Sequence, residues 1–280
     1  MLIDKPAGPT SHDVVQRARR VLGTRAVGHT GTLDPFATGL LVILVGRATR
    51  LARFVEAERK TYLATARLGV ATDTDDLTGR PLAEPVATAH LEVEEIRRAL
   101  IGFLGPGCQR PPRYSAKHVG GERSYRLARR GVPVQPADAE VTVYDVELVG
   151  AAAGAVHFRA TVSAGTYLRA LARDLGERLG VGAHLTALRR EAIGTLRVED
   201  AVRLDELSPA HVLPPRRALG HLPARELDET ELAAVSHGRA VPAAPDVAGH
   251  IALVHGEELV AVARVEDGWL RPSVVLEAPA

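Results

Sequence analysis

One carboxylate lies in a segment whose composition suits it to catalysis. Residues 28–39 read GHTGTLDPFATG, so three glycines and three threonines surround Asp34. Glycine adopts backbone conformations that are closed to other residues, and Pro35 disfavours a helical conformation at the residue before it. We therefore expect an ordered loop that presents Asp34 in an extended conformation. Such a carboxylate can act as a nucleophile or a general base, whereas the plainer alternative is a connecting loop whose polar side chains bond its own backbone.

Three other side chains could take part in chemistry, although each also has a purely structural interpretation. Tyr62 lies in an alternating stretch that predicts a strand, where a half-buried aromatic residue is common. Arg169 stands near the start of a predicted helix and is, by itself, most simply a surface arginine. His29, five residues before Asp34, could serve only to bond the loop through a ring nitrogen.

The motifs of the chain resemble those of one known enzyme family. Residues 28–39 match, at every fixed letter, the pattern GHTGxLDPxATG, which is the catalytic motif of the TruB family of bacterial tRNA pseudouridine-55 synthases. The resemblance continues almost unbroken to about residue 195. It includes DKPxGxTS at 4–11, TDTxD at 72–76, QxPPxYSA at 109–116, GTYxR at 165–169 and GAHxxxLRR at 182–190.

The resemblance implies a role for each candidate residue. Asp34 would be the catalytic aspartate that isomerises a uridine at position 55, in the T loop of tRNA. Arg169 would pair with this carboxylate, keeping it ionised and fixing its direction. Tyr62 would lie against the target base, with Leu188 on the apolar side of the uracil pocket. Because the base must leave the stack of the loop, His29 would fill the gap that the base leaves.

Three further residues are implied as supporting ones. Lys5 and Pro6 belong to the 4–11 segment, which the resemblance places beside the Asp34 loop as structural support. Lys117 departs from the family pattern, because an aliphatic residue usually separates the Ser-Ala pair from the lysine, and here the lysine directly follows Ala116. The amine of Lys117 would reach the same place from one position earlier.

The expected chemistry needs neither a metal nor a cofactor. Uracil is detached from its ribose, turned and rejoined through C5, with no electron or group carrier. The chain agrees, since it contains no Walker loop, no GxGxxG after a strand, no HExxH and no CxxC. Its single cysteine, Cys108, excludes an intramolecular disulfide and a cysteine-based zinc site. Whether Asp34 attacks covalently or removes a sugar proton in a glycal route stays open.

Composition is typical of a cytoplasmic enzyme. Of 280 residues, 46% are hydrophobic, which is enough for a substantial core. No apolar run is long enough to predict a membrane span, and residues 1–6 are charged almost at once, unlike a signal peptide. We therefore expect a cytoplasmic monomer that binds the T stem-loop of tRNA, without a membrane, a guide RNA or a protein partner.

The net charge of +1 hides an uneven distribution. Residues 1–60 carry 10 Lys and Arg against 5 Asp and Glu, and residues 105–130 carry 7 against 1. Residues 205–280 reverse this balance, with 6 against 12. The basic stretches could line a phosphate-binding face, whereas the acidic end should repel a polyanion unless its charges face away. Solvated helix faces explain each stretch equally well.

The predicted fold class is α+β. The resemblance implies the pseudouridine synthase fold over residues 1–215, with a mixed, mainly antiparallel central sheet flanked by helices. Apolar periodicity predicts helices at 11–22, 48–57, 91–103 and 169–179. Residues 222–280 show short alternating strands and one short helix around 229–236, which resemble a small β-rich, PUA-like RNA-binding domain.

Two other functions fit parts of the pattern. An RNA-guided relative from eukaryotes and archaea has a similar catalytic loop, but the QxPPxYSA segment and the short tail favour the stand-alone bacterial form. A non-catalytic RNA-binding or tRNA-folding protein would keep the scaffold and lose an essential residue, and none is lost here. Activity on free tRNA without a guide RNA distinguishes these alternatives.

Overall fold

The chain forms two compact units, which are described separately. The first unit comprises Met1–Pro35, Gly39–Ala57 and Ile193–Ala280, and the second comprises Phe36–Thr38 and Glu58–Ala192. The computed structural model describes residues 1–114, 118–119, 122–123, 130, 132, 136–244 and 247–276.

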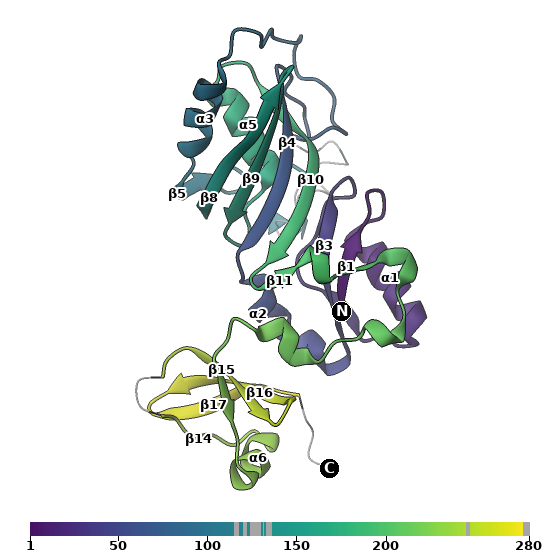
Figure 1. Ribbon diagram of the computed structural model, residues 1–280, viewed down its shortest axis with the longest axis vertical. Coiled ribbons are helices and arrows are strands. Elements are labelled where there is room, and N and C mark those ends of the chain that lie inside the picture. Colours follow the sequence, from purple (N-terminus) through teal and green to yellow (C-terminus); the bar gives the residue numbers. More distant parts are fainter. Residues whose placement is uncertain are drawn as a thin grey trace. The chain divides into compact units, whose positions relative to one another are not determined.

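The first unit begins with a strand and a capped helix. Strand β1 (Leu2–Lys5) leads into helix α1 (Ser11–Leu22; Figure 1). The Thr10 side chain accepts a hydrogen bond from Asp13 N, and the Asp13 carboxylate accepts one from Thr10 N at 2.8 Å. Gly23, with a φ of 63°, ends the helix in the left-handed conformation that glycine favours. The helix predicted over 11–22 is confirmed.

The strands β2 (Val27–His29) and β3 (Thr38–Val45) lie on either side of the Asp34 loop in the sequence. Strand β3 pairs antiparallel with both β1 and β2, while β1 also pairs parallel with β12 (Val202–Arg203). The register places Lys5 opposite Gly39. These strands share a buried core with α1 that includes Ile3, Val14, Val15, Ala18, Leu41 and Ile43.

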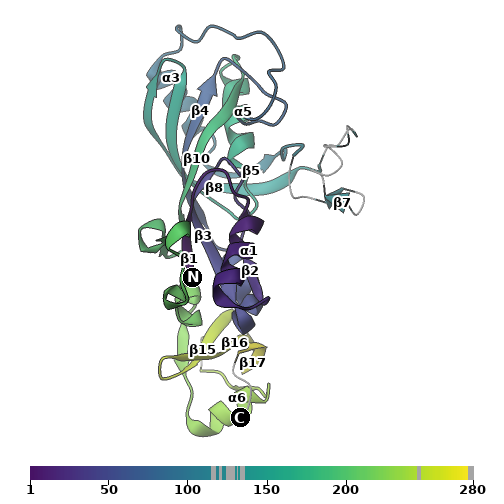
Figure 2. The same ribbon diagram turned by 90° about the vertical axis from the view of Figure 1, so that its right-hand side faces the viewer.

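The C-terminal part of the first unit is a five-stranded sheet with one helix. Its strands are β13 (Ala224–Glu226), β14 (Val241–Pro242), β15 (His250–His255), β16 (Glu258–Glu266) and β17 (Trp269–Val275). Their order is β13-β15-β16-β17-β14, and α6 (Glu229–Ser236) lies beside them (Figure 2). A buried cluster containing Val235, Leu253 and Val260 joins α6 to one face of the sheet. The predicted short strands and the helix at 229–236 are confirmed.

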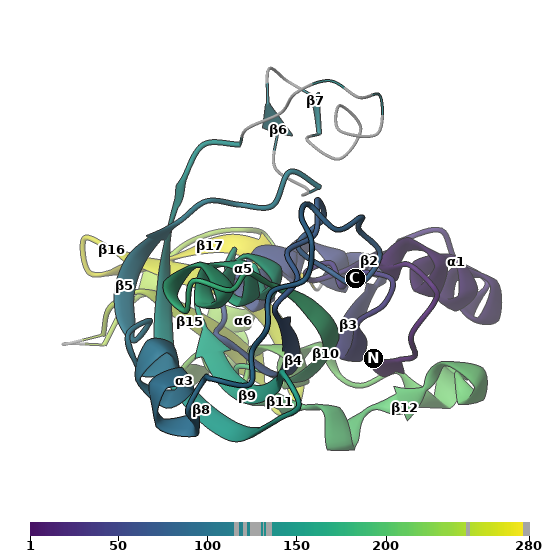
Figure 3. The same cartoon turned by 90° about the horizontal axis from the view of Figure 1, so that it is seen from above.

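The second unit is a sheet covered on one face by two helices. It consists of β4 (Lys60–Leu68), α3 (Val93–Ile101), β5 (Gly105–Gln109), β8 (Ala139–Ala152), β9 (Ala155–Val162), α5 (Leu168–Arg178) and β10 (Ala183–Ile193), together with the short strands β6 (His118–Val119) and β7 (Glu122–Arg123). The strand order is β10-β4-β9-β8-β5, and α3 and α5 lie on the same side (Figure 3). The helices predicted at 91–103 and 169–179 are confirmed.

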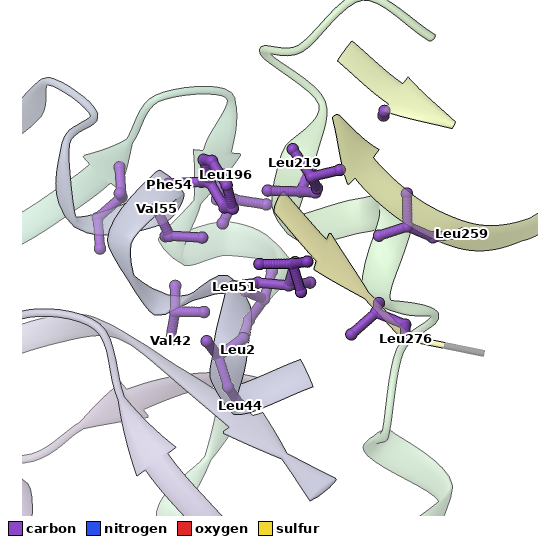
Figure 4. Packing of buried hydrophobic residues seen from close by; sticks show 14 of the residues in the cluster. Leu2, Val42, Leu44, Leu51, Phe54, Val55, Leu196, Leu219, Leu259 and Leu276 are labelled. Carbon is purple, nitrogen blue, oxygen red and sulfur yellow. The ribbon is translucent and has the colours of Figure 1, made fainter. Parts of the chain in front are cut away.

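In the first unit, the helical segment after β3 packs on the second face of the C-terminal sheet. A single helix is predicted over 48–57, but the chain forms a 3₁₀ helix, η1 (Gly46–Leu51), followed by a short α-helix, α2 (Ala52–Glu56). The Thr49 hydroxyl donates to Gly46 O at 2.8 Å, a local bond that favours the tighter 3₁₀ turn. The shared core (Figure 4) includes Leu51, Phe54, Val55, Leu219, Val254, Leu259, Val262 and Leu276.

The predicted fold class is confirmed. The strand pairs within each unit are mostly antiparallel, with parallel pairs at β1–β12 and β13–β15, and helices accompany the sheets. The predicted boundary between residues 215 and 222 stays a prediction. The remaining short elements are β11 (Leu196–Arg197), η2 (Val198–Asp200), η3 (Leu204–Glu206), η4 (Pro209–His211) and η5 (Pro215–Leu219).

Candidate active site

Asp34 lies in an irregular loop of the first unit, between β2 and β3. Leu33, just before it, is 3% exposed, whereas Asp34 itself is half-buried. Pro35 and Phe36 form a turn, after which the chain enters β3. The loop is therefore anchored through Leu33 and leaves the Asp34 side chain partly accessible to solvent.

The segment after β1 holds this loop by its backbone. The Lys5 side chain is fully buried, and its Nζ donates to two carbonyl oxygens of its own segment, both at 2.9 Å, and to Pro35 O at 3.2 Å. Gly8 N also donates to Pro35 O, at 2.8 Å. The Ser11 hydroxyl accepts from Leu33 N at 2.9 Å and donates to Leu33 O at 3.2 Å. The residues on both sides of Asp34 are thus fixed by this segment.

Two other predicted residues of the first unit adjoin the same strands. Pro6 directly follows β1, and its carbonyl is one of the acceptors of the Lys5 ammonium. His29 is the last residue of β2, half-buried, and its Cα lies opposite that of Ile43 in β3. His29 therefore stands at the point where the chain leaves the sheet and enters the Asp34 loop.

Arg169 is buried in the first turn of α5, in the second unit. Only 5% of its side chain is exposed. Its Nη1 donates to Thr74 O at 3.0 Å, and its Nη2 donates to Tyr114 O at 2.9 Å. The same Nη1 lies 3.6 Å from Asp76 Oδ2. The interpretation of Arg169 as a surface arginine is wrong, because three partners on two separate segments fix its guanidinium.

Asp76 is a candidate functional residue that sequence reasoning does not single out. Its side chain is 8% exposed, and its Oδ1 accepts from Thr78 N at 2.9 Å, from the Thr78 hydroxyl at 2.6 Å and from the Thr74 hydroxyl at 2.8 Å. The available signal is the acidic string TDTDD at 72–76, which also carries part of the family resemblance. Three aspartates in one turn do not by themselves show which of them faces an arginine.

A second ion pair attaches the same turn to α5. Asp75 has a φ of 60°, and its Oδ2 accepts from Arg173 Nη1 at 3.0 Å. Burial raises the pKa of the Asp75 carboxyl, and the nearby Arg173 and Arg169 oppose that effect. Arg173 lies one helical turn after Arg169, so two adjacent aspartates of the turn bind two arginines on one face of α5.

Tyr62 and Leu188 come from neighbouring strands of the second unit. Tyr62 lies in β4, opposite Ala160 of β9, and is 7% exposed. Leu188 lies in β10, the strand next to β4, and is 8% exposed. The aromatic ring of Tyr62 is more deeply buried than the half-buried strand position expected from the sequence.

The predicted site residues are divided between the two units. The ion pair between Asp34 and Arg169 that the resemblance implies stays a prediction, and Lys117 lies outside the described residues. The first unit contains Lys5, Pro6, His29 and Asp34, and the second contains Tyr62, Arg169 and Leu188.

Comparison with known proteins identifies the family. Residues 19–168 match the family model described as TruB family pseudouridylate synthase (N terminal domain), and residues 169–220 match the tRNA pseudouridylate synthase B C-terminal domain. The chain belongs to the TruB family of pseudouridylate synthases. The resemblance drawn from the motifs is thereby confirmed.

TruB-family relatives match nearly the whole chain. The tRNA pseudouridine synthase B of Thermobifida fusca is 45% identical over 86% of this chain and 85% of its own. That of Solibacter usitatus is 42% identical over 88% of this chain and 86% of its own. That of Mycobacteroides abscessus is 40% identical, covering 100% of this chain and 96% of its own.

Solved structures support the same fold. A Cbf5-Nop10-Gar1 complex contains a chain that matches with a TM-score of 0.77 and 27% identity, over 99% of this chain and 84% of that chain. An H/ACA RNP bound to a substrate RNA containing 2′-deoxyuridine contains a chain that matches with a TM-score of 0.75 and 24% identity, over 98% of this chain and 84% of that chain. The second likeness shows the fold alone.

Two further observations concern only the described part of the chain. There, three or more His, Cys, Asp or Glu side chains are nowhere gathered in a way that could hold a metal ion. Within the same residues, every helix is too short or too polar to cross a membrane.

Proposed function

We propose that this TruB-family enzyme isomerises the uridine at position 55, in the T loop of tRNA, to pseudouridine. The relatives that match nearly its whole length are named for this type of reaction on tRNA. The observation that carries the proposal is the Asp34 loop, which contains every fixed letter of the family's catalytic motif and is held on both sides of the carboxylate by the Lys5 segment.

The proposed chemistry assigns the central role to the Asp34 carboxylate. The bond between N1 of uracil and C1′ of ribose breaks, the base turns, a bond forms between C5 and C1′, C5 loses its proton to solvent, and N1 gains a proton. An ionised carboxylate can attack the sugar or the base, or it can remove the sugar proton that leads to a glycal. In each route the product contains the same atoms as the substrate, so no co-reactant is consumed.

Arg169 is proposed to orient Asp34 and to keep it ionised. The Arg169 guanidinium donates to Thr74 O and Tyr114 O and lies 3.6 Å from the Asp76 carboxylate, and a guanidinium presents its N–H donors to carboxylates in a fixed plane. Because its known partners fix the plane of the guanidinium, little rotamer freedom is left to lose when it binds an anion. Arg169 is therefore a positioning group rather than a proton carrier, since arginine stays protonated at any working pH.

The target base is proposed to bind against Tyr62 and Leu188. A uracil extruded from the T loop loses its stacking, which costs a few kcal/mol. A planar phenol ring and an apolar side chain on adjacent strands offer replacement contacts to the base. His29, at the exit of β2, is proposed to occupy the space that the base leaves in the T loop.

We propose that the enzyme works in the cytoplasm as a monomer, without a guide RNA or a protein partner. Purified protein is incubated with an unmodified tRNA transcript tritiated at C5 of uridine, and tritium release is measured. A transcript with cytidine at position 55 is the control. Release from the first transcript alone supports the proposal, whereas release that requires a guide RNA favours the RNA-guided alternative. Tight tRNA binding without release or pseudouridine favours a binding or folding protein.

A further inference from the structure

Arg173 connects α5 to two other segments of the second unit. Its Nη1 donates to Asp75 Oδ2 at 3.0 Å, and its Nη2 donates to Arg110 O at 2.9 Å. The side chain of Arg173 is 12% exposed and that of Asp75 is 13% exposed. The ion pair is thus largely shielded from water, where opposite charges attract strongly and a charge without a partner is costly.

Asp75 lies between the two residues of its turn that contact Arg169. Thr74 O accepts a hydrogen bond from Arg169 Nη1, and the Asp76 carboxylate lies 3.6 Å from the same nitrogen. Asp75 has a φ of 60°, and its carbonyl oxygen accepts from Leu185 N of β10 at 3.0 Å. The backbone of Asp75 is therefore fixed on β10, while its side chain reaches a helix that carries two arginines one turn apart.

Both arginines act electrostatically on the Asp75 carboxylate. Burial raises the pKa of Asp75, the charge of Arg173 lowers it, and the charge of Arg169 lowers it further. Asp174 raises the pKa of Asp75 and itself binds Arg173, with 2.7 Å between Asp174 Oδ1 and Arg173 Nη2. Without the charge of Arg173, Asp75 and Asp174 would repel each other, and Arg169 would be the arginine whose charge still attracts Asp75.

We propose that Arg173 is a positioning residue that holds the Asp75 carboxylate away from Arg169. The inference rests on the proposed function, in which Arg169 is assigned to the catalytic carboxylate. Two carboxylates beside one guanidinium compete for the same N–H donors. By binding Asp75, Arg173 leaves the Arg169 guanidinium in the geometry that its own partners set, and so preserves the plane in which it can orient Asp34.

Two other roles for Arg173 make different predictions. A residue that only stabilises the fold lowers the unfolding temperature and leaves the kcat of the folded enzyme unchanged. A residue that binds a phosphate of the substrate raises KM and leaves kcat unchanged, because its contact is made equally in the ground state and in the transition state. The positioning role predicts a lower kcat with an unchanged KM.

The test measures kcat and KM for tRNA in variants of both partners. Arg173→Gln keeps an N–H donor and removes the charge, so kcat should fall about tenfold while KM stays within about twofold of the wild type. Asp75→Asn removes the competing carboxylate and leaves Arg173 with Asp174, so kcat should stay within about threefold. The double variant should recover most of the kcat that Arg173→Gln loses, because no carboxylate is left at position 75 to compete for Arg169.

A charge-preserving variant and a matched control complete the comparison. Arg173→Lys retains a positive charge beside Asp75, so kcat should stay within about threefold of the wild type. Because this variant keeps the ion pair, it tests the proposal even if Arg173→Gln does not fold. Arg178, in the last turn of α5, is exposed and donates to Ala99 O at 3.1 Å, away from the turn that contains Asp75. Arg178→Gln should therefore leave kcat and KM unchanged.

All rates are measured at temperatures where circular dichroism shows each variant to be folded. A wild-type kcat in Arg173→Gln, a rise in KM alone, or a double variant as slow as Arg173→Gln would each overturn the proposal. A kcat about tenfold lower in Arg173→Lys would also overturn it, because the charge beside Asp75 would then not be the cause. A wild-type enzyme that binds tRNA and releases no tritium contradicts the proposed function instead.

Discussion

The carboxylate of Asp76 lies 3.6 Å from the guanidinium of Arg169, measured from Oδ2 to Nη1, and both side chains are almost fully buried. Asp76 is itself held by Thr74 and by the backbone and hydroxyl of Thr78. A charged pair in such a setting cannot easily change its geometry, because moving either partner leaves buried charge poorly compensated. The turn at 72–79 thus orients the arginine that we assign to the catalytic aspartate.

Asp76→Asn should lower turnover while the enzyme still binds tRNA. The amide keeps an acceptor for Thr78 and removes the charge that faces Arg169. Loss of one partner of a buried pair should reduce the free energy of unfolding by about 3 kcal/mol. A displaced guanidinium should reduce the single-turnover rate by about 10- to 100-fold. Urea denaturation and single-turnover assays at saturating tRNA measure the two effects.

The matched control for Asp76→Asn is Asp73→Asn. Asp73 lies in the same turn and accepts a hydrogen bond from Arg80 N at 2.8 Å, a bond that an asparagine oxygen can also accept. Its single-turnover rate should stay within about twofold of the wild type. If Asp76→Asn also reacts at the wild-type rate, Asp76 has no part in positioning Arg169.

Lys5→Met should disturb the Asp34 loop from within the first unit. The substitution removes the ammonium that donates to three carbonyl oxygens, including that of Pro35. Buried acceptors that lose a charged donor should lower the free energy of unfolding by about 3 kcal/mol. We also expect a lower kcat at temperatures where the variant is folded, since the backbone beside Asp34 is no longer fixed.

Thr10→Ala serves as the control for Lys5→Met. It removes the side-chain cap of α1, which costs about 1 kcal/mol, without touching the Asp34 loop. Its kcat should match that of the wild type in the same temperature range. A Lys5→Met enzyme with the wild-type kcat would show that the ammonium stabilises the fold and does not position the carboxylate.

Tyr62 is expected to act mainly through its ring. Tyr62→Phe keeps a planar face for the base and loses only the hydroxyl, whereas Tyr62→Leu removes the plane. Since base stacking on an aromatic ring is worth about 1–3 kcal/mol, Tyr62→Leu should reduce kcat/KM by about 10- to 100-fold and Tyr62→Phe by much less. Steady-state assays on tRNA measure both. Equal losses in the two variants would assign the effect to the hydroxyl.

The sequence predicts the local elements better than the contacts between them. The Thr10 cap and Gly23 define α1 because both signals act within a few residues of the helix. Arg169 illustrates the limit: its burial depends on Thr74, Tyr114 and Asp76, which come from distant segments. No local pattern encodes such long-range contacts, so only the family resemblance pointed to this arginine.

The helical segment η1–α2 illustrates a second limit. Apolar spacing predicts one helix over 48–57, and the side chains Leu51, Phe54 and Val55 are indeed buried. Their packing partners include strands about two hundred residues later in the chain, such as β16. Periodicity shows that a face is apolar and does not show which element will cover it.

Phe54→Ala should test whether residues 222–280 fold independently. The ring belongs to the core shared by α2 and the C-terminal sheet, so its removal should cost about 3–5 kcal/mol. If this core makes the first unit unfold cooperatively, the midpoints of urea unfolding measured by Trp269 fluorescence and by far-UV circular dichroism should fall by the same amount. A midpoint that falls for only one of these two probes would support a C-terminal domain that folds independently.

Asp34→Asn tests the central claim most directly. The variant keeps the size and the loop of the wild type and loses the charge that the proposed chemistry requires. Tritium release from tRNA labelled at C5 of uridine should fall to background, while the dissociation constant for tRNA stays within about threefold of the wild type. Turnover by the Asp34→Asn enzyme at a rate near that of the wild type would contradict the account.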